Sequence, residues 1–325
     1  MTDETSGDHA ILRKSLYGTT GEPSYAGALS FMRRKYTRDL DGVDLAVSGV
    51  PLDTATTNRP GARFGPRAIR AASTIMAWDR PYGMGFDPFD RLAVIDYGDC
   101  FLDLARPESV PAAIEEHAYQ IIAAGPGLLS LGGDHFASYP LLKAHARKLG
   151  APLSLLQFDA HSDTWDDERG RIDHGTMFYH AVQEGLVDPA SSVQIGLRTR
   201  NEETLGFNIL DADWVHEHGI SAAVLETRAV LGDRPVYLTF DIDCLDPSYA
   251  PGTGTPVCGG LTTHQAMSIL RGLLGIELVG MDVVESAPAY DVGEITALAG
   301  AHIAMEMICI YASRRPRQRQ PDLTP

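Results

Sequence analysis

Metal-ligand side chains recur at every second position in one short stretch of the chain. Asp159, His161 and Asp163 lie in the run QFDAHSDTWDD, directly after the apolar residues 153–156. In extended chain, alternate residues point to the same side, so this spacing places two carboxylates and one imidazole on one face. Carboxylates held this close together repel one another unless cations lie between them. The stretch therefore predicts a divalent metal site at the end of a strand.

Two other apolar runs end in the same types of residue. Asp134 and His135 follow GLLSLGG, and Asp241 and Asp243 follow PVYLTF. Sites in open parallel sheets form at the carboxyl ends of the strands, so the three clusters can converge there. Bridging carboxylates can hold two divalent ions roughly 3.5–4 Å apart. A donor set rich in oxygen favours Mn²⁺, although Co²⁺, Ni²⁺ or Zn²⁺ could substitute. The predicted ligands are His135, Asp159, His161, Asp163, Asp241 and Asp243.

The elements that must position these residues alternate between strands and helices. We expect strands at 43–50, 91–98, 127–133, 153–160, 191–197, 235–243 and 277–285, and helices at 65–73, 108–125, 139–150 and 263–275. Continuous apolar strands separated by helices are typical of a mostly parallel sheet covered on both faces. No linker or change of composition divides the 325 residues. We predict a single α/β domain over residues 1–325, with an N-terminal arm (1–24) and a C-terminal tail (313–325).

Composition excludes several classes of partner. The formal net charge of −16, from 43 acidic and 27 basic residues, argues against binding to nucleic acid. We find neither a signal pattern nor an apolar stretch that reaches the roughly 18 residues of a membrane span. The four cysteines are scattered, which favours a reducing compartment. We therefore expect a cytoplasmic protein without nucleic-acid or membrane partners.

Six motifs, in this order, resemble those of the ureohydrolases, the family of arginases and agmatinases. They are GGDH (132–135), DAHSD (159–163), DHGTMF (173–178), FDIDCLDP (240–247), GTGTPVCGGL (252–261) and MDVVESAP (281–288). Within the family, the chain is most similar to the bacterial agmatinases. The resemblance implies a three-layer α/β/α fold, assembly into trimers or hexamers, and two Mn²⁺ ions per subunit. It assigns one ion to His135, Asp159, Asp163 and Asp241, and the other to Asp159, His161, Asp241 and Asp243.

The resemblance also implies roles in catalysis for His174, Glu285 and Asp163. A guanidinium is a poor electrophile, so its hydrolysis needs the strong nucleophile that water shared by two metal ions can supply. Glu285 would hold the guanidinium through paired, charge-assisted hydrogen bonds. His174 would act as a general acid–base residue and as a contact of the substrate, and Asp163 would hold and pass the proton of the shared water. The implied reaction is hydrolysis of agmatine to putrescine and urea.

The tail of the guanidino substrate is left open by the sequence. Loop 164–173 carries four acids, Asp166 among them, which would suit the amine of agmatine, and two arginines, which would suit a carboxylate. Loop 54–67 adds Asn58 and further arginines that could bind the substrate. The Asn- and Ser-bearing loop by which arginases read arginine is absent, which disfavours arginase activity. We predict an agmatinase, with a guanidinobutyrase or guanidinopropionase as the alternative.

Two other classes of protein remain as alternatives. One is a zinc deacetylase-like hydrolase, because histone deacetylases resemble this family in fold. A second metal position at Asp241 and Asp243, and the GTGTP and VVESAP motifs, speak against it. The other is a non-catalytic homologue that only binds guanidino compounds. The presence of His174, Glu285 and all six predicted ligands disfavours such a loss of catalysis.

Overall fold

A nine-stranded parallel sheet forms the centre of the protein. The structure is a computed structural model, and it describes residues 8–19, 22–77, 80–166 and 170–315. The strand order of the sheet is β1-β3-β2-β4-β9-β8-β5-β6-β7, and each neighbouring pair is parallel. All seven predicted strands are present, and the short strands β1 and β7 are additional. The strands are β1 (Lys35–Tyr36), β2 (Leu45–Val50), β3 (Val94–Asp99), β4 (Gly127–Gly132), β5 (Ser154–Phe158), β6 (Val193–Ile195), β7 (Asn208–Leu210), β8 (Pro235–Asp241) and β9 (Glu277–Val284).

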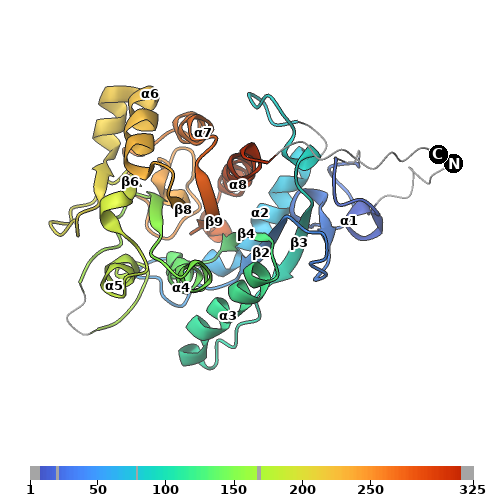
Figure 1. Ribbon diagram of the computed structural model, residues 1–325, viewed down its shortest axis with the longest axis horizontal. Coiled ribbons are helices and arrows are strands. Elements are labelled where there is room, and N and C mark those ends of the chain that lie inside the picture. The colour runs from blue at the N-terminus through green and yellow to red at the C-terminus, as the bar shows by residue number, and fades with distance from the viewer. Residues whose placement is uncertain (1–7, 20–21, 78–79, 167–169, 316–325) are drawn as a thin grey trace.

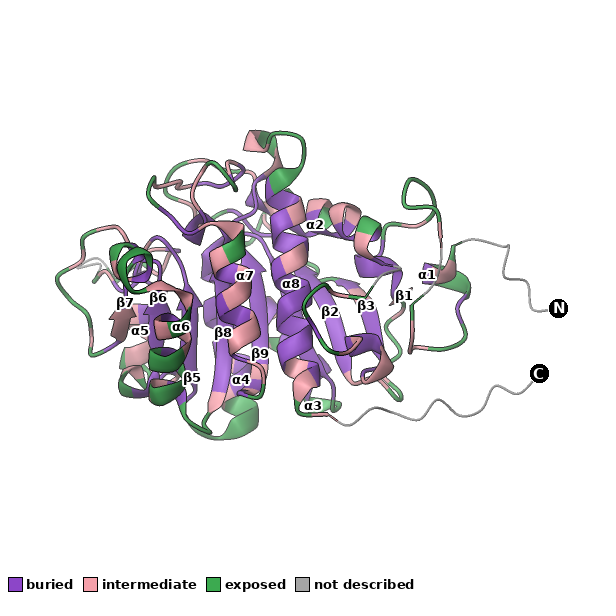
Figure 2. Cartoon of the chain, turned by 90° about the horizontal axis from the view of Figure 1, so that it is seen from above, coloured by how far each residue is buried: buried purple, intermediate pink, exposed green. Residues whose placement is uncertain are grey.

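Helices cover both faces of the sheet, which confirms the three-layer α/β/α fold (Figures 1 and 2). One face shares an apolar cluster with α2 (Gly65–Ser73), α6 (Ala212–Leu231), α7 (Thr263–Gly272) and α8 (Ile295–Ser313). The other shares a second cluster with α3 (Val110–Ala123), α4 (Ser138–Leu149) and α5 (Met177–Gln183). The remaining short helix, α1 (His9–Leu12), lies near the N-terminus. The four predicted helices correspond to α2, α3, α4 and α7.

Single turns of 3₁₀-helix occur in the segments between these elements. They are η1 (Phe31–Arg33), η2 (Ala62–Phe64), η3 (Thr74–Met76), η4 (Pro88–Asp90), η5 (Pro107–Ser109), η6 (His135–Ala137), η7 (Pro189–Ser191), η8 (Ile242–Cys244) and η9 (Pro288–Tyr290). Turns η6 and η8 directly follow β4 and β8. They therefore lie at the carboxyl edge of the sheet and carry two of the predicted metal ligands, His135 and Asp243.

The register of four central strands brings their carboxyl ends side by side. Leu131 of β4 pairs with Val283 of β9, Asp241 of β8 pairs with Val284 of β9, and Phe158 of β5 pairs with Phe240 of β8. Strand β5 follows β4 in the sequence, but the later strands β9 and β8 lie between them in the sheet. The segments after β4, β9, β8 and β5 therefore leave the sheet from adjacent positions. This is the edge at which open parallel sheets bind ligands.

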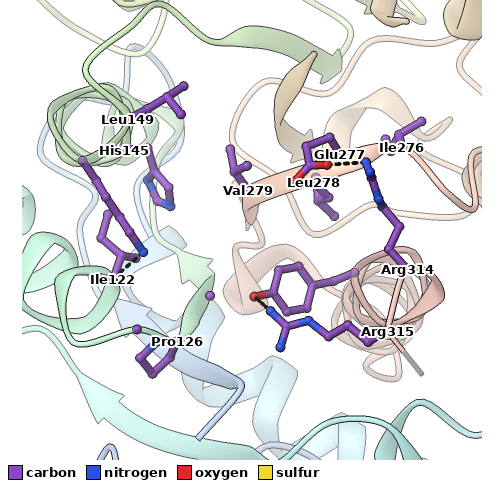
Figure 3. A pocket seen from close by; sticks show the side chains of 14 residues that line it. Ile122, Pro126, His145, Leu149, Ile276, Glu277, Leu278, Val279, Arg314 and Arg315 are labelled. Atoms are coloured by element: carbon purple, nitrogen blue, oxygen red, sulfur yellow. Dashed lines mark hydrogen bonds and ion pairs between the residues drawn. The ribbon is translucent and has the colours of Figure 1, made fainter. Parts of the chain in front are cut away.

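The described parts of the expected arm and tail contact the domain. In the arm, the backbone amide of Gly18 donates to the carbonyl of Phe89 at 2.9 Å, and the hydroxyl group of Tyr17 donates to Asp44 at 3.3 Å. Arg315 pairs with Asp44 at 2.8 Å. Its guanidinium also donates to the hydroxyl group of Tyr311, which is the dashed line that starts at Arg315 in Figure 3. Helix α8 continues to residue 313, where the tail was expected to begin. The rest of the arm (1–7 and 20–21) and of the tail (316–325) lies outside the described residues.

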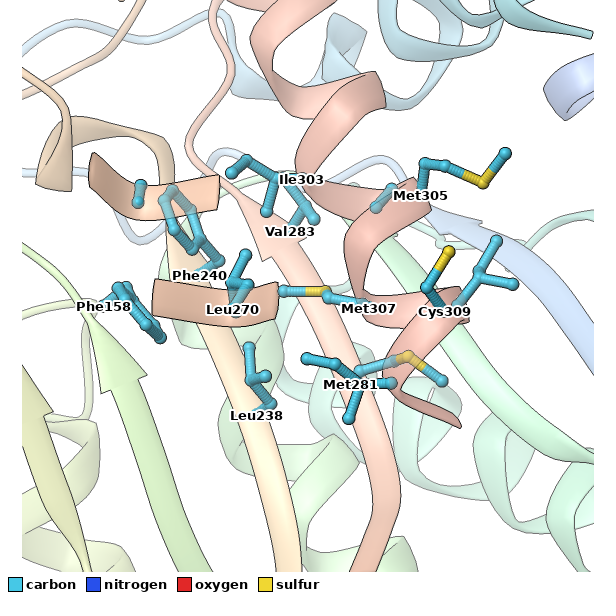
Figure 4. Close-up of a cluster of buried hydrophobic side chains, with 14 of the residues drawn as sticks. Phe158, Leu238, Phe240, Leu270, Met281, Val283, Ile303, Met305, Met307 and Cys309 are labelled. Carbon is cyan, nitrogen blue, oxygen red and sulfur yellow. The ribbon is translucent and has the colours of Figure 1, made fainter. Parts of the chain in front are cut away.

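Helix α8 was not predicted from the sequence, although it is a core element. Met307 and Ile303 pack in one apolar cluster with strand residues such as Met281 and Val283 (Figure 4). By length and composition alone this helix could cross a membrane, which contradicts the expectation that no apolar stretch is long enough. However, 78% of its most apolar 18-residue window is buried inside the protein. A helix that is apolar on nearly all sides and buried to this extent is typical of the core of a globular protein.

Candidate metal centre and substrate pocket

The six predicted metal ligands come together at the carboxyl edge of three strands. His135 begins the turn after β4, Asp241 ends β8, and Asp243 lies in the turn that follows. The loop after β5 brings Asp159, His161 and Asp163. The side chains of all six residues are buried, except that of His161, which is half-buried. Residues more than 80 positions apart in the chain thus form one acidic cluster.

One nitrogen of His135 faces three carboxylates. Its Nδ1 atom lies 2.9 Å from an oxygen of Asp163, 3.0 Å from Asp159 and 3.2 Å from Asp241. This buried nitrogen has no partner with hydrogen-bond geometry among the described residues. A single hydrogen could satisfy at most one of the three oxygens, whereas a divalent cation attracts all of them and the nitrogen lone pair. The arrangement therefore fits a metal ion.

A second group of ligands shares Asp159 with the first. The Nδ1 atom of His161 lies 3.1 Å from an oxygen of Asp243 and 3.5 Å from Oδ1 of Asp159. Oδ2 of Asp159 is the oxygen that faces His135. The potential ligand atoms of His135, Asp159 and Asp241 lie within 4.8 Å of one another, and so do those of Asp159, His161 and Asp243. One carboxylate thus presents an oxygen to each group, as a pair of bridged ions requires.

Several pKa values show how costly this crowding is without cations. Burial and the charge of Asp159 raise the pKa of Asp163 to about 7. Burial, with the charges of Asp243 and Asp159, raises the pKa of Asp241 well above its ordinary value. Burial disfavours a charge on His161, but the surrounding carboxylates raise its pKa to about 12. Without cations, the cluster would take up protons, which neutralise part of its negative charge. Bound divalent cations would neutralise this charge in place of the protons.

Hydrogen bonds from neighbouring groups hold the carboxylates in place. The side chain of Gln157, inside β5, donates to Asp159 at 2.8 Å. The backbone amide of Asp243 donates to Asp241 at 2.8 Å, and that of Ala160 donates to Asp243 at 3.1 Å. Asp163 has a φ of 53°, a left-handed conformation that costs free energy in a residue other than glycine. Such strain is typical of functional sites.

Glu285 follows β9 and lies fully buried beside the acidic cluster. Its Oε1 atom accepts hydrogen bonds from the backbone amide of His135 and from Nδ1 of His174, each at 2.9 Å. Its Oε2 atom has no partner among the described residues. Its φ of 63° is again left-handed. A buried carboxylate oxygen without a donor is costly, and a cationic ligand would satisfy it.

His174 connects Glu285 to the loop over residues 54–67. Its Nε2 atom accepts from the backbone amide of Thr57 at 2.9 Å and lies 2.8 Å from the hydroxyl group of Thr57. Burial disfavours its charge, yet the hydrogen bond and charge of Glu285, with Asp163 and Asp134, raise its pKa to about 9. The amide of Thr57 favours the neutral ring, whereas the carboxylates favour the protonated ring. The hydrogen bond from Thr57 and the charges of the carboxylates thus have opposite effects on the pKa of His174. A histidine in such an environment is suited to exchange protons.

A cavity of about 220 Å³ opens beside the cluster. Thr57 of loop 54–67 and Trp165 of loop 164–173 line it, so both loops that were expected to reach the substrate contribute a side chain. Gly175 and Thr255 also line it and were not singled out from the sequence. Thr255 lies in the GTGTP motif and donates to Asp243 at 3.1 Å. The full lining is Thr57, His161, Asp163, Trp165, His174, Gly175, Asp241 and Thr255.

The residues expected to select the substrate tail lie outside this lining. Asn58 donates its amide group to the carbonyl of Gly254 at 3.0 Å, and Asp166 is exposed. Arg59 lies over the ring of Tyr290 at 5.1 Å. Arg63 forms an ion pair with Asp53. Of the other expected tail residues, 167–169 lie outside the described part of the chain. Arg59 and Arg63 of loop 54–67 thus contact Tyr290 and Asp53 and are not part of the cavity lining.

A larger cavity, of about 580 Å³, lies at the opposite edge of the sheet (Figure 3). It is lined by the first residues of β4 and β9 and contains none of the predicted site residues. Lys148 donates there to the carbonyl of Ile122 in the last turn of α3, and Arg314 pairs with Glu277. Cations near helix carboxyl ends stabilise the exposed carbonyl groups. Lys148 and Arg314 thus have structural contacts in the larger cavity, and none of the predicted site residues lies there. We therefore take the smaller cavity beside the acidic cluster as the functional site.

Comparisons with known proteins give a consistent result. The model of the arginase family matches residues 43–309. An agmatinase of Chromobacterium violaceum is 58% identical over 317 residues, which cover 97% of this chain and 98% of that protein. A crystal structure of a hypothetical agmatinase from Burkholderia thailandensis is 60% identical, with a TM-score of 0.93 and coverage of 95% and 98%. A proclavaminate amidino hydrolase of Streptomyces clavuligerus is 38% identical, with a TM-score of 0.83 and coverage of 90% and 99%.

Proposed function

The chain belongs to the arginase family, and from this premise we propose that it is a manganese-dependent agmatinase, which hydrolyses agmatine to putrescine and urea. The observation that carries the proposal is the position of Asp159, whose two oxygens face His135 and His161. This carboxylate can bridge two ions, and a bridged pair is the feature that hydrolysis of a guanidinium needs. The names of similar proteins point to agmatine among the possible guanidino compounds.

We assign the six ligands to two Mn²⁺ ions. One ion is held by His135, Asp159, Asp163 and Asp241, and the other by Asp159, His161, Asp241 and Asp243. Each ion then has one imidazole among oxygen donors, a combination that suits Mn²⁺ better than Zn²⁺. When bound, the pair of ions lowers the pKa of water so that hydroxide is available at neutral pH.

Glu285 is the residue that we propose to bind the guanidinium. A guanidinium is cationic and presents several N–H donors in one plane. Oε2 of Glu285 is the acceptor without a partner among the described residues, whereas Oε1 is already shared by His135 and His174. A charge-assisted hydrogen bond to Oε2 would satisfy this oxygen and hold the guanidinium carbon near the metal cluster.

His174 and Asp163 are the residues that we propose to handle protons. The amine of the substrate leaves only if its nitrogen receives a proton. His174 lines the cavity, and its hydrogen bond to Glu285 fixes the orientation of the ring. Asp163 also lines the cavity, and its carboxylate lies 2.9 Å from Nδ1 of His135. It is placed to accept the proton that water loses.

The amine of agmatine suits the pocket better than a carboxylate does. Arg59 and Arg63, which could have bound a carboxylate, contact Tyr290 and Asp53 instead. The charged side chains that line the cavity are Asp163, Asp241 and two histidines. We retain Asn58 and Asp166 as proposed contacts of the tail, because both lie on loops that contribute to the lining. No arginine or lysine is among the described residues that line the cavity, so the lining offers the carboxylate of a guanidino acid no cationic side chain to pair with.

Rates of urea release from four guanidino compounds test this proposal. With saturating Mn²⁺, agmatine is expected to give a kcat/KM about 100-fold or more above those of 4-guanidinobutyrate, 3-guanidinopropionate and arginine, because a misplaced carboxylate costs several kcal/mol. A higher value for either guanidino acid would show that the pocket reads a carboxylate. Absence of urea from all four compounds would contradict ureohydrolase activity.

We also propose that the protein is a cytoplasmic homo-oligomer, a trimer or hexamer of single-domain subunits, without nucleic-acid or membrane partners. All four cysteines are free, which supports a reducing compartment. The net charge of −16 opposes binding to phosphate backbones. Large apolar side chains remain exposed, such as Phe64, Ile75 and Tyr82. Where such exposed side chains form a contiguous patch, they are typical of contacts between subunits.

A further inference from the structure

A buried carboxylate lies beneath the metal cluster and takes no part in the proposed chemistry. Asp282, in β9, is inaccessible to solvent and accepts hydrogen bonds from three hydroxyl groups. Tyr237 donates at 2.6 Å, Thr239 at 2.6 Å and Ser138 at 2.8 Å. The hydroxyl group of Thr239 also lies 2.8 Å from Nε2 of His135. A chain of hydrogen bonds therefore joins Asp282 to a predicted metal ligand.

The direction of each hydrogen bond in this chain follows from counting hydrogens. A threonine hydroxyl group has one hydrogen, and that of Thr239 is used by Asp282. Ser138, 3.4 Å from Thr239, likewise uses its own hydrogen on Asp282. In its hydrogen bond with His135, the hydroxyl group of Thr239 can therefore act only as the acceptor. Nε2 of His135 must carry the hydrogen, and Nδ1 of the neutral ring is left with a lone pair.

The lone pair on Nδ1 points to where the metal ion is proposed to bind. Nδ1 is the atom that lies 2.9–3.2 Å from oxygens of Asp159, Asp163 and Asp241. A neutral imidazole with a bare nitrogen is the form of histidine that binds metal ions, and the partner of the other nitrogen selects it. We propose that Thr239 and Asp282 are positioning residues, which fix the tautomer and the orientation of His135 for the first Mn²⁺ ion. The inference rests on the metal centre of the proposed function.

The arrangement of β8 and β9 explains how these residues meet. Thr239 and Asp282 are directly paired across the two strands. Tyr237, Thr239 and Asp241 occupy alternate positions of β8, so the anchoring hydroxyl groups and the metal ligand share one face. Phe178 packs edge-on against the ring of His135, with 5.3 Å between the ring centres. It offers no acceptor, which leaves Thr239 as the described partner of Nε2.

Binding of Mn²⁺ to the metal-stripped, full-length protein tests the inference. The variant Thr239→Val keeps the shape of the side chain and removes the acceptor of His135. Calorimetric titration is expected to show about 10–100-fold weaker binding of one of the two ions, since loss of such a partner typically has this effect. The electron paramagnetic resonance spectrum at two equivalents should then change from that of a coupled Mn²⁺ pair toward that of isolated ions.

Two further variants separate positioning from packing. Thr239→Ser restores the acceptor and should bind both ions within about threefold of the wild type. Tyr237→Phe removes a different hydroxyl group from the same carboxylate and should also stay within about threefold. If the valine variant does not fold, Thr239→Ala removes the same oxygen and gives the same comparison.

Three results would overturn the inference. The first is Thr239→Val, or its alanine substitute, binding both ions like the wild type. The second is that Tyr237→Phe weakens the binding of one Mn²⁺ ion as much as Thr239→Val does, because that would indicate a general effect of packing. The third is Thr239→Ser failing to restore affinity. Wild-type protein that binds no Mn²⁺ would overturn the proposed metal centre as well, which distinguishes failure of the function from failure of the inference alone.

Discussion

Replacement of Asp241 by alanine is expected to abolish binding of Mn²⁺ and release of urea together. Asp241 ends β8 and lies within 3.2 Å of His135 Nδ1, and we assign it to both ions. Loss of a shared ligand should disrupt the pair of ions and with it the source of hydroxide. We expect kcat/KM for agmatine to fall by about 10³-fold or more, or about 4 kcal/mol. Metal content per chain and urea release are the two measurements.

The stability of the metal-free variant provides an internal check on this result. Asp241 is one of several buried carboxylates that repel one another, and its pKa is raised by burial and by Asp243 and Asp159. Metal-free Asp241→Ala should therefore melt no lower than the metal-free wild type. Asp233→Ala, which removes an exposed carboxylate near the start of β8, serves as the matched control. An Asp241→Ala enzyme with two bound ions and full activity would contradict the assignment of ligands.

Glu285→Gln is expected to remove activity while leaving both metal ions bound. The glutamine has the shape of the glutamate but lacks the charge, and its amide nitrogen is a donor where the guanidinium needs an acceptor. Loss of one partner from a buried charged pair costs about 2–5 kcal/mol, so kcat/KM should fall by about 30- to 5,000-fold. The metal content should stay at two ions per chain, because Glu285 is not among the proposed ligands.

The matched control for this variant is Glu226→Gln on the exposed side of α6, which should retain wild-type kinetics. A Glu285→Gln enzyme with normal kcat/KM would exclude the proposed contact with the guanidinium. Loss of Mn²⁺ in the variant would point instead to a structural role, since Oε1 of Glu285 also holds the backbone amide of His135. The two measurements together decide between these roles.

The strands, and the meeting of the six proposed metal ligands at one edge of the sheet, could be predicted because their signals are local. Apolar runs that end in Asp159 or Asp241 mark both a buried strand and the position at which it leaves the sheet. Alternate spacing then places ligands on one face of each segment. Parallel strands share one carboxyl edge, so three local patterns sufficed to predict one site.

Other elements could not be predicted because their signals are not periodic or not local. Helix α8 is apolar on nearly all sides, so it lacks the stripe that marks a helix against a core. Helix α6 contains Gly219 with a φ of 83°, which interrupts its pattern. Gly175 and Thr255 enter the cavity from loops, where no spacing rule applies. The link from His135 through Thr239 to Asp282 depends on the register between β8 and β9, which only the structure provides.

Urea release from agmatine by metal-stripped protein, measured as Mn²⁺ is added back, tests the central claim most directly. We predict no urea without metal and a rise to a plateau at two equivalents of Mn²⁺ per chain, with putrescine formed in equal amounts. Urea release by the stripped protein, or none from agmatine at saturating Mn²⁺, would contradict the claim that two ions in this cluster of aspartates and histidines hydrolyse agmatine.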